Sequence, residues 1–253
     1  MNRSARTRLD TLLVARGVTE SREKARALIL AGKVTVVGHP TPKPGSLVRD
    51  DAEVRVAEPE HPWVGRGGIK LARALEAFAI DVGGQLGIDI GASTGGFTDV
   101  MLQRGARRVI AIDVGHGQLH WKLRTDPRVT LIEGLNARTL DAAMLPDLGA
   151  GADIVTIDVS FISLTYILPV VPPLLSGDAN VVALVKPQFE AGRAEVGRGG
   201  LVRDPAVHAR VIETVTAAAG AVGLARVRLI DSPILGSEGN REFLMHLRPT
   251  END

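Results

Sequence analysis

The sequence predicts an α/β protein, with a seven-stranded, mainly parallel, doubly wound sheet that follows a small α+β domain. Seven apolar runs of strand length come after residue 85, and several are separated by stretches of helical spacing. A proline-rich stretch over residues 58–62 precedes them. The first 56 residues carry eleven Lys or Arg against six Asp or Glu, whereas the remainder has a net charge of −4. We therefore expect domains over residues 1–60 and 65–253, joined by a linker over 61–64.

Composition narrows the class of protein. The chain has 253 residues and no cysteine, so disulfide bonds and cysteine chemistry are excluded. No apolar stretch approaches the roughly 20 residues that a membrane-spanning helix needs, and the N-terminus lacks the apolar core of a signal peptide. We expect a cytoplasmic protein that does not bind a membrane.

In the first domain, local signals predict two helices and two strands. The first helix has leucines at helical spacing and ends at Gly17. Ser21 is a suitable N-cap for the second helix, which ends at Gly32. Alternating residues over 33–37 and 51–56 predict the strands. The basic residues on and around the second helix indicate a surface for a polyanion, although charge alone is equally typical of an ordinary solvated face.

This segment, from about Arg8 to Val56, resembles the S4 RNA-binding domain. It contains the strings R-L-D, S-R-x-x-A-x-x-L-I, G-K-V-x-V and K-P-x-x-x-V-x-x-D. The resemblance implies RNA as the partner, without identifying a reaction, because S4 domains accompany several enzymes. The expected RNA-binding residues are Arg8, Arg22, Lys24, Arg26, Lys33 and, beyond the linker, Arg66.

The second domain begins with a helix over residues 70–78 and continues into the strands of the sheet. The expected strands cover residues 86–90, 109–113, 129–133, 154–158, 181–186, 227–230 and 243–247. Ligands of doubly wound sheets bind beyond the carboxyl ends of the parallel strands. The candidate functional residues should therefore gather at that edge.

A glycine-rich loop after the first of these strands, together with Asp113 at the end of the second, predicts a cofactor site. Glycines allow close approach to a ligand, and a carboxylate at Asp113 suits a ribose diol. The loop reads G-A-S-T-G-G and lacks the G-x-G-x-x-G of pyrophosphate-binding sites, which argues against a nicotinamide dinucleotide. Asn136 either contacts the adenine or is a plain turn residue. The expected cofactor-binding residues are Gly91, Ser93, Thr94, Gly95, Gly96, Phe97, Asp113, Asn136 and Asp158.

Four charged residues stand where apolar or turn residues are expected: Lys70, Asp158, Lys186 and Glu242. A lysine that closes an apolar strand is costly to bury unless it is paired, and Asp158 and Glu242 are suitable partners. Each residue alone would fit a salt bridge, but together at the ligand edge they favour catalysis. No residue cluster suggests a metal. His116 and His120 lack a third ligand and are interpreted as surface residues.

These four residues resemble the K-D-K-E tetrad of FtsJ-like ribose 2'-O-methyltransferases, which have a Rossmann-like sheet. The whole chain is similar to the TlyA family, whose members are also called hemolysins. It contains G-R-G-G-x-K-L, D-I-G-x-S-T-G-G-F-T-D, I-D-V-S-F-I-S-L and L-V-K-P-Q-F-E. Gly65 replaces the usual serine of the first string, and Glu238 competes with Glu242 for the last acid. We choose Glu242, because it follows Gly-Asn as the family's acid does.

The resemblance implies S-adenosylmethionine as cofactor and methyl transfer to cytidine 2'-hydroxyls of small- and large-subunit rRNA, within assembled subunits. Lys186 is expected to accept the hydroxyl proton or to polarise the hydroxyl, with Asp158 and Glu242 orienting the lysines. The basic segment 188–203 is interpreted as a flap that orders on ligands, and the protein as a monomer. A nicotinamide oxidoreductase, a membrane-lysing toxin and a non-catalytic RNA-binding protein are the alternatives.

Overall fold

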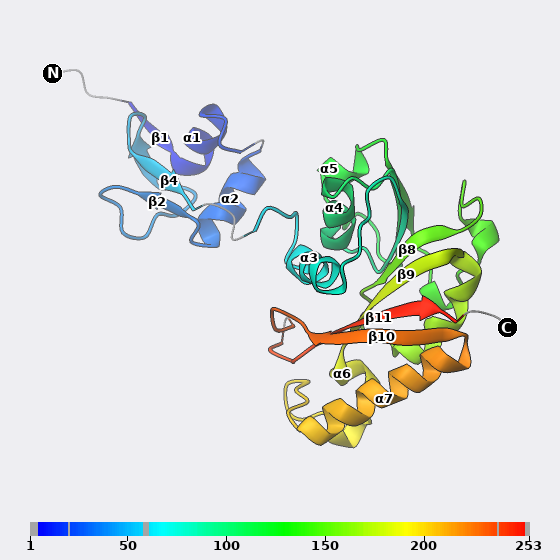
Figure 1. Ribbon diagram of the computed structural model, residues 1–253. Coiled ribbons are helices and arrows are strands. Elements are labelled where there is room, and N and C mark those ends of the chain that lie inside the picture. Colours follow the sequence, from blue (N-terminus) through cyan, green and yellow to red (C-terminus); the bar gives the residue numbers. More distant parts are fainter. Residues whose placement is uncertain (1–4, 20, 58–60, 237, 251–253) are drawn as a thin grey trace. The chain divides into compact units, whose positions relative to one another are not determined.

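The computed structural model describes residues 5–19, 21–57, 61–236 and 238–250. Its chain divides into two compact units, Met1–Pro62 and Trp63–Asp253 (Figure 1). Residues 58–60 of the proline-rich stretch lie outside the described residues. Each unit has a hydrophobic core of its own.

The first unit consists of two helices and two short antiparallel strand pairs. In chain order its elements are β1 (Arg6–Arg8), α1 (Leu9–Ala15), α2 (Arg22–Leu30), β2 (Val34–Val36), β3 (Leu47–Arg49) and β4 (Val54–Val56). Strand β1 pairs with β3, and β2 pairs with β4. The Ser21 hydroxyl accepts a hydrogen bond from the amide of Lys24 at 3.2 Å, which confirms the predicted N-cap of α2. The core contains Leu9, Leu13, Ala25 and Ile29 from the helices.

The second unit contains the predicted seven-stranded sheet, in the order β10-β11-β9-β8-β5-β6-β7. Its strands are β5 (Leu86–Ile90), β6 (Arg108–Asp113), β7 (Val129–Glu133), β8 (Ala152–Ile157), β9 (Leu175–Val185), β10 (Leu224–Asp231) and β11 (Phe243–Pro249). The five strands from β5 to β9 are parallel, and β11 runs antiparallel to both its neighbours, β9 and β10. The prediction of a mainly parallel sheet is confirmed.

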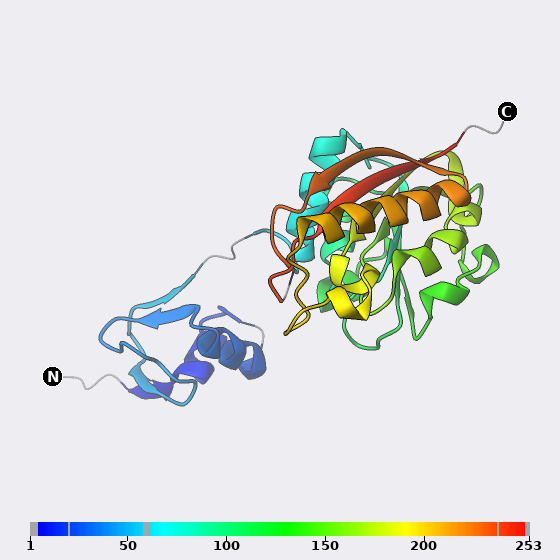
Figure 2. The same ribbon diagram turned by 90° about the horizontal axis from the view of Figure 1, so that it is seen from below.

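Helices cover both faces of this sheet (Figure 1, Figure 2). They are α3 (Gly67–Phe78), α4 (Gly96–Gln103), α5 (Trp121–Arg124), α6 (Pro187–Glu190) and α7 (Pro205–Ala221). Alternate residues of β6 enter different cores, since Ile110 packs in the core on the α7 side while Val109 and Ala111 pack in the core on the α3 and α4 side. This division explains why the strands read as continuous apolar runs.

The connection between β8 and β9 is made of short 3₁₀ turns, where an α/β sheet would ordinarily have a helix. Three of these turns cover Leu164–Tyr166, Leu168–Val170 and Pro172–Leu174. Proline lacks a backbone N–H and clashes with the preceding turn, so the prolines in this connection prevent a longer helix. Among the described residues, no helix is both long and apolar enough to cross a membrane.

Candidate active site

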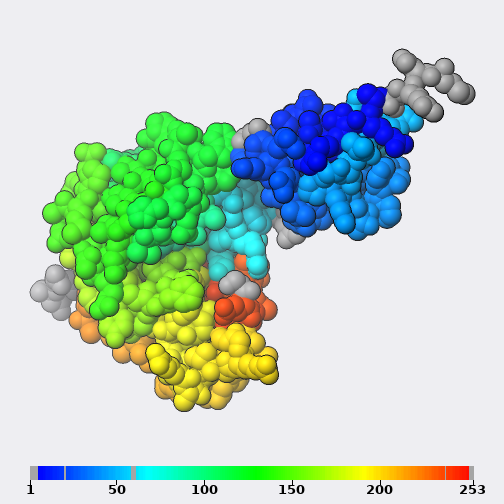
Figure 3. Space-filling model, turned by 180° about the vertical axis from the view of Figure 1, so that it is seen from behind, coloured from blue at the N-terminus to red at the C-terminus, as the bar shows by residue number. Residues whose placement is uncertain are grey.

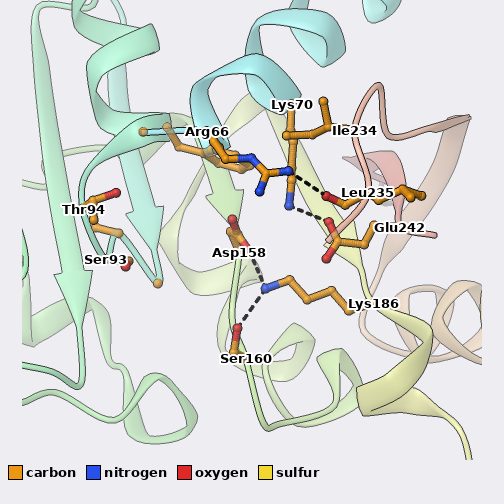
Figure 4. A pocket seen from close by; sticks show the side chains of 15 residues that line it. Arg66, Lys70, Ser93, Thr94, Asp158, Ser160, Lys186, Ile234, Leu235 and Glu242 are labelled. Atoms are coloured by element: carbon orange, nitrogen blue, oxygen red, sulfur yellow. Dashed lines mark hydrogen bonds and ion pairs between the residues drawn. The ribbon is translucent and has the colours of Figure 1, made fainter. Parts of the chain in front are cut away.

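A cavity of about 300 Å³ lies at the carboxyl ends of the parallel strands (Figure 4). Lys70 enters it from α3, Asp158 directly follows β8, Lys186 directly follows β9, and Glu242 directly precedes β11. Four segments that are distant in sequence thus bring the four charged side chains to one space. The topology explains this placement, because the ends of neighbouring parallel strands meet at this edge.

The four side chains form two ion pairs. Lys70 Nζ donates to Glu242 Oε2 at 2.5 Å, and Lys186 Nζ lies 2.6 Å from Asp158 Oδ1. Lys70, Lys186 and Glu242 are each at most 9% exposed. Each buried ammonium therefore has one carboxylate that offsets its loss of hydration. Removing one partner of the more deeply buried pair, Lys70 with Glu242, would leave an uncompensated buried charge, which typically costs about 3–5 kcal/mol.

The structure distinguishes the two candidate acids at the end of the chain. Glu242 lines the cavity and holds Lys70, whereas Glu238 is exposed and is not among the lining residues. The absence of a side chain at Gly236 makes room for Glu242, since a Cβ there would lie 2.4 Å from Glu242 Oε1. Of the two candidates, Glu242 is therefore the acid that lies at this cavity.

A second cavity, of about 460 Å³, adjoins the first and shares Gly91, Ser93, Asp158 and Ser160 with it. Its wall includes apolar side chains, among them Ile112, Leu135, Val159 and Ile167, and the carboxylates Asp113 and Asp158. No Lys or Arg is among its lining residues. A cavity with two carboxylates and no cation favours a positively charged ligand and disfavours a pyrophosphate.

The expected cofactor residues in the glycine-rich loop fall into three groups, according to which cavity they line. Gly91 and Ser93 line both cavities, whereas Thr94, Gly96 and Phe97 line only the first. Gly95 lines neither cavity and packs against Leu123 instead, since a Cβ at its position would lie 2.2 Å from a methyl group of that leucine. Its glycine is needed for packing and for its left-handed conformation, with φ of 95°.

Asp113 and Asn136 both line the second cavity and both make local hydrogen bonds. The carboxylate of Asp113 accepts from the amides of Ser93 and Gly115, each at 2.7 Å. Two oxygens have about four acceptor sites, so Asp113 can still accept from a diol. The Asn136 side chain accepts from the amide of Arg138 at 3.0 Å and so caps a 3₁₀ turn. Asn136 therefore fits both interpretations that its sequence position left open.

Asp89, which the sequence analysis did not select, lies beneath the glycine-rich loop and is fully buried. Its carboxylate accepts from the amide and hydroxyl of Thr98 at 2.9 and 2.7 Å and from the Thr156 hydroxyl at 3.0 Å. These bonds join β5, β8 and the first turn of α4. The sequence signal that could have identified Asp89 is a carboxylate inside the otherwise apolar strand L-G-I-D-I. Burial raises the pKa of Asp89 to about 6, opposed by the hydrogen bonds.

The raised pKa of Asp89 predicts a specific pH dependence of stability. Between pH 4 and 6 the folded protein retains a proton on this carboxyl that the unfolded chain has released, so the stability falls as pH rises through this window. The contribution is about 3 kcal/mol, from a shift of roughly two units. Urea unfolding at pH 4.5 and 7 should show that Asp89→Asn removes this fall. Equal pH dependence in the wild type and the variant would contradict the assignment.

Two of the expected RNA-binding residues of the first unit, Arg8 and Arg22, contact the buried carboxylate of Asp10. Asp10 is fully buried and accepts from Arg8 at 2.8 Å and from Arg22 at 3.3 Å. The Arg8 guanidinium is the main cause of a lowered pKa at Asp10, with Arg22 contributing. Arg22, Lys24 and Arg26 are exposed positions of α2. Asp10 thus fixes two arginines while leaving part of each guanidinium exposed.

In the second unit, Arg66 lies at the rim of the first cavity, where its guanidinium donates to the carbonyl of Leu235 at 3.4 Å (Figure 4). An aromatic pair that the sequence analysis did not select includes Phe161, which lines the second cavity. Phe161 is 90% exposed, has a left-handed φ of 64° and lies 5.2 Å from the ring of Phe189. Lys186 Nζ is 5.8 Å from the same Phe189 ring. Exposed aromatic rings beside a charged site are suited to contact a planar ligand.

The segment proposed as a flap has defined contacts at both ends. Glu190 accepts from the amide of Leu164 at 2.7 Å, and the amide of Val202 donates to the side chain of Asn240 at 2.9 Å. Figure 3 shows the residues between them, in yellow, at the surface of the second unit. Arg193, Arg198 and Arg203 all belong to this segment. Whether it reorders on ligands stays a prediction.

Among the described residues, no group of three or more His, Asp or Glu has the geometry of a metal site. His120 accepts from the amide of Lys122 at 3.3 Å and caps the start of α5.

Two family models match the chain. The model of FtsJ-like methyltransferases matches residues 63–249, and the model of the S4 domain matches residues 7–54. Both resemblances expected from the sequence are thereby confirmed.

Individual relatives match almost the whole chain. It is 48% identical over 249 residues to a Mycobacterium tuberculosis protein named 16S/23S rRNA (cytidine-2'-O)-methyltransferase TlyA, with 98% of this chain and 91% of the relative covered. It is 41% identical over 239 residues to Hemolysin A of Brachyspira hyodysenteriae, covering 94% and 98%. A solved structure of a candidate hemolysin from Streptococcus thermophilus has a TM-score of 0.75 at 45% identity, covering 99% of this chain and 90% of that one.

Proposed function

Because the chain belongs to the TlyA family of FtsJ-like methyltransferases, we propose that it transfers a methyl group from S-adenosylmethionine to a cytidine ribose 2'-hydroxyl of rRNA. The target lies in 16S rRNA, 23S rRNA or both. The main support for the proposal is the arrangement of two ion pairs, Lys70 with Glu242 and Lys186 with Asp158, around one cavity. This cavity adjoins a second one that has no Lys or Arg among its lining residues.

The second cavity suits S-adenosylmethionine better than a nicotinamide dinucleotide. The cofactor carries a sulfonium, an ammonium, one carboxylate, a ribose and an adenine, but no phosphate. Asp113 would accept hydrogen bonds from the ribose hydroxyls, and the apolar wall with Ile112 and Ile167 would hold the adenine. Asp158 would face the positively charged part of the cofactor. A dinucleotide would place a pyrophosphate in a cavity whose lining residues include two carboxylates and no cation.

When bound, S-adenosylmethionine supplies an electrophilic methyl group attached to sulfur. The chain's own residues hold the acceptor. Lys186 would hold the ribose hydroxyl by hydrogen bonding. It would either accept the hydroxyl proton or stabilise the oxygen while that proton passes to water. Asp158 holds Lys186 in place, and Glu242 holds Lys70 on the opposite wall. A target ribose must leave regular A-form helix to reach this cavity, so an unpaired or splayed-out nucleotide is the expected substrate.

The first unit would hold the rRNA through its basic residues: Arg8, Arg22, Lys24, Arg26 and Lys33. Arg66, at the rim of the first cavity, would contact the backbone beside the target nucleotide. Arginines oriented by a carboxylate present fixed donors to phosphate oxygens. The protein would act as a monomer in the cytoplasm, on rRNA within assembled subunits.

Removing two charges from α2 should weaken RNA binding without changing the chemistry. Arg22 and Arg26 lie one helical turn apart, so the double variant Arg22→Ala, Arg26→Ala should raise KM for rRNA roughly tenfold and leave kcat unchanged. The slope of log affinity against log salt concentration should fall by about two. The charge-matched control is the double variant Arg104→Ala, Arg226→Ala, in the second unit. Equal loss in both double variants would contradict the role of the first unit.

Two other functions are less well supported. A membrane-lysing toxin, suggested by the name of the Brachyspira relative, has no support in the described residues, where no helix could span a membrane. A non-catalytic RNA-binding protein would not need two buried ion pairs around a cavity.

The test is tritiated-methyl transfer from S-adenosylmethionine to purified small subunits, large subunits and protein-free rRNA. Label that survives alkali within an uncleaved dinucleotide is expected, because a methylated 2'-oxygen cannot attack the neighbouring phosphate. The absence of label on all three substrates, with the cofactor shown to bind, would contradict the proposal.

A further inference from the structure

Ser160 contacts the head group of Lys186 beside the ion pair with Asp158. Its Oγ accepts a hydrogen bond from Lys186 Nζ at 2.9 Å, and Asp158 Oδ1 lies 2.6 Å from the same nitrogen (Figure 4). Ser160 lines both cavities. In the part of the chain that the structure describes, its hydroxyl has no other hydrogen-bond partner. The hydroxyl therefore acts on Lys186 and does not hold the loop together.

The number of acceptors at Nζ determines what the lysine can offer to a ligand. An ammonium has three N–H donors, and a neutral amine has two donors and one lone pair, in both cases in a tetrahedral arrangement. With Asp158 alone, two directions at Nζ would remain open, and the lone pair of a neutral amine could take either. With Ser160 accepting as well, one direction remains. Two acceptors thus define a single N–H or a single lone pair for the ligand.

The loop that carries Ser160 is also tied to the segment that carries Lys186. Glu190, the last residue of α6, accepts from Ser163 Oγ at 2.5 Å and from the amide of Leu164 at 2.7 Å. Helix α6 begins directly after Lys186, and Ser163 follows Ser160 by three residues. These bonds hold the two segments together next to the contact between Ser160 and Lys186.

We propose that Ser160 is a positioning residue for methyl transfer, because its hydroxyl leaves one direction at Lys186 Nζ for the ribose 2'-hydroxyl. The inference rests on the proposed function, since it requires Lys186 to meet that hydroxyl. It adds to the tetrad a fifth residue, which acts through Lys186.

The test compares Ser160→Ala, Ser160→Thr and the control Ser176→Ala in the full-length protein. Ser176 is a partly buried serine in β9 whose hydroxyl donates to Asp153 at 3.4 Å, and it lines neither cavity. Steady-state kinetics would use tritiated S-adenosylmethionine and the ribosomal subunit that the wild type labels. Misdirecting a reacting group should lower kcat of Ser160→Ala about 10- to 100-fold, with both KM values within about threefold of wild type. Ser160→Thr, which retains the hydroxyl, should recover most of the rate, and Ser176→Ala should match the wild type.

Two outcomes would overturn the inference while leaving the proposed function in place. One is an unchanged kcat in Ser160→Ala, with or without a rise in KM, and the other is a Ser160→Thr variant as slow as the alanine variant. A wild-type protein that methylates no ribose would contradict the proposed function itself, and this inference with it.

Discussion

Lys186→Ala is expected to lower the rate of methyl transfer about 10²- to 10⁴-fold, the range typical of a lost proton-transfer group. Binding of S-adenosylmethionine should stay within about threefold of wild type, since Lys186 lines the first cavity and not the second. The variant leaves Asp158 without its cation, but this carboxylate is 22% exposed and lies beside the expected position of a cationic cofactor. Single-turnover rates and calorimetric titration with the cofactor measure the two quantities separately.

Two further variants make this result interpretable. Lys122→Ala shortens an exposed lysine of α5 by the same number of atoms and should be fully active. Lys186→Arg keeps the charge and the partner carboxylate but provides a group that stays protonated. If Lys186 accepts the proton, the arginine variant should be as slow as the alanine variant, whereas partial activity indicates that positive charge and positioning suffice. A Lys186→Ala variant with more than a tenth of the wild-type rate would contradict a role in the reaction.

Gly91→Ala is expected to lower the free energy of unfolding by about 2–5 kcal/mol and to abolish cofactor binding. Gly91 has a left-handed φ of 86°, and a Cβ there would lie 2.4 Å from the carbonyl oxygen of Asp158 and 2.9 Å from its carbonyl carbon. Backbone atoms cannot turn aside as a flexible side chain can. The clash would therefore displace Asp158, which is the ion-pair partner of Lys186.

Gly84→Ala is the matched control for this prediction. Gly84 also has a left-handed φ, of 69°, but a Cβ there would meet no atom within 4 Å. It should therefore show only the conformational cost, about 1–2 kcal/mol, and bind the cofactor normally. Urea unfolding and cofactor titration of both variants would check this. Equal effects of the two substitutions would show that the close approach of Gly91 to Asp158 contributes neither to stability nor to cofactor binding.

The strands of the sheet could be predicted where apolar residues predominate, as in the fully buried β5 and the partly buried edge strand β7, whose expected bounds both match the structure. Strand β9 begins at Leu175, six residues before the predicted start, because its first half is polar and gives no apolar signal. Strands β1 and β3 were missed for a similar reason. Each has three residues with charged side chains among them, and each depends on pairing with the other.

The site could be predicted where a charged residue stands in an apolar context, as Lys186 does. Which carboxylate pairs with which lysine could not be predicted, since only the three-dimensional arrangement assigns Glu242 to Lys70 and Asp158 to Lys186. The same limit applies to Asp89, whose partners come from α4 and β8, and to Ser160, whose role depends on the position of Lys186.

The most direct test of the central claim is to identify the atom that is methylated. Subunits from cells that lack the protein would be treated with the wild type and S-adenosylmethionine, and the rRNA would be digested to nucleosides for mass spectrometry. We expect a methylated cytidine that fragments to an unmodified cytosine and a methylated ribose, and that is absent with Lys186→Ala. A methyl group on the base would contradict an active site built around a ribose hydroxyl.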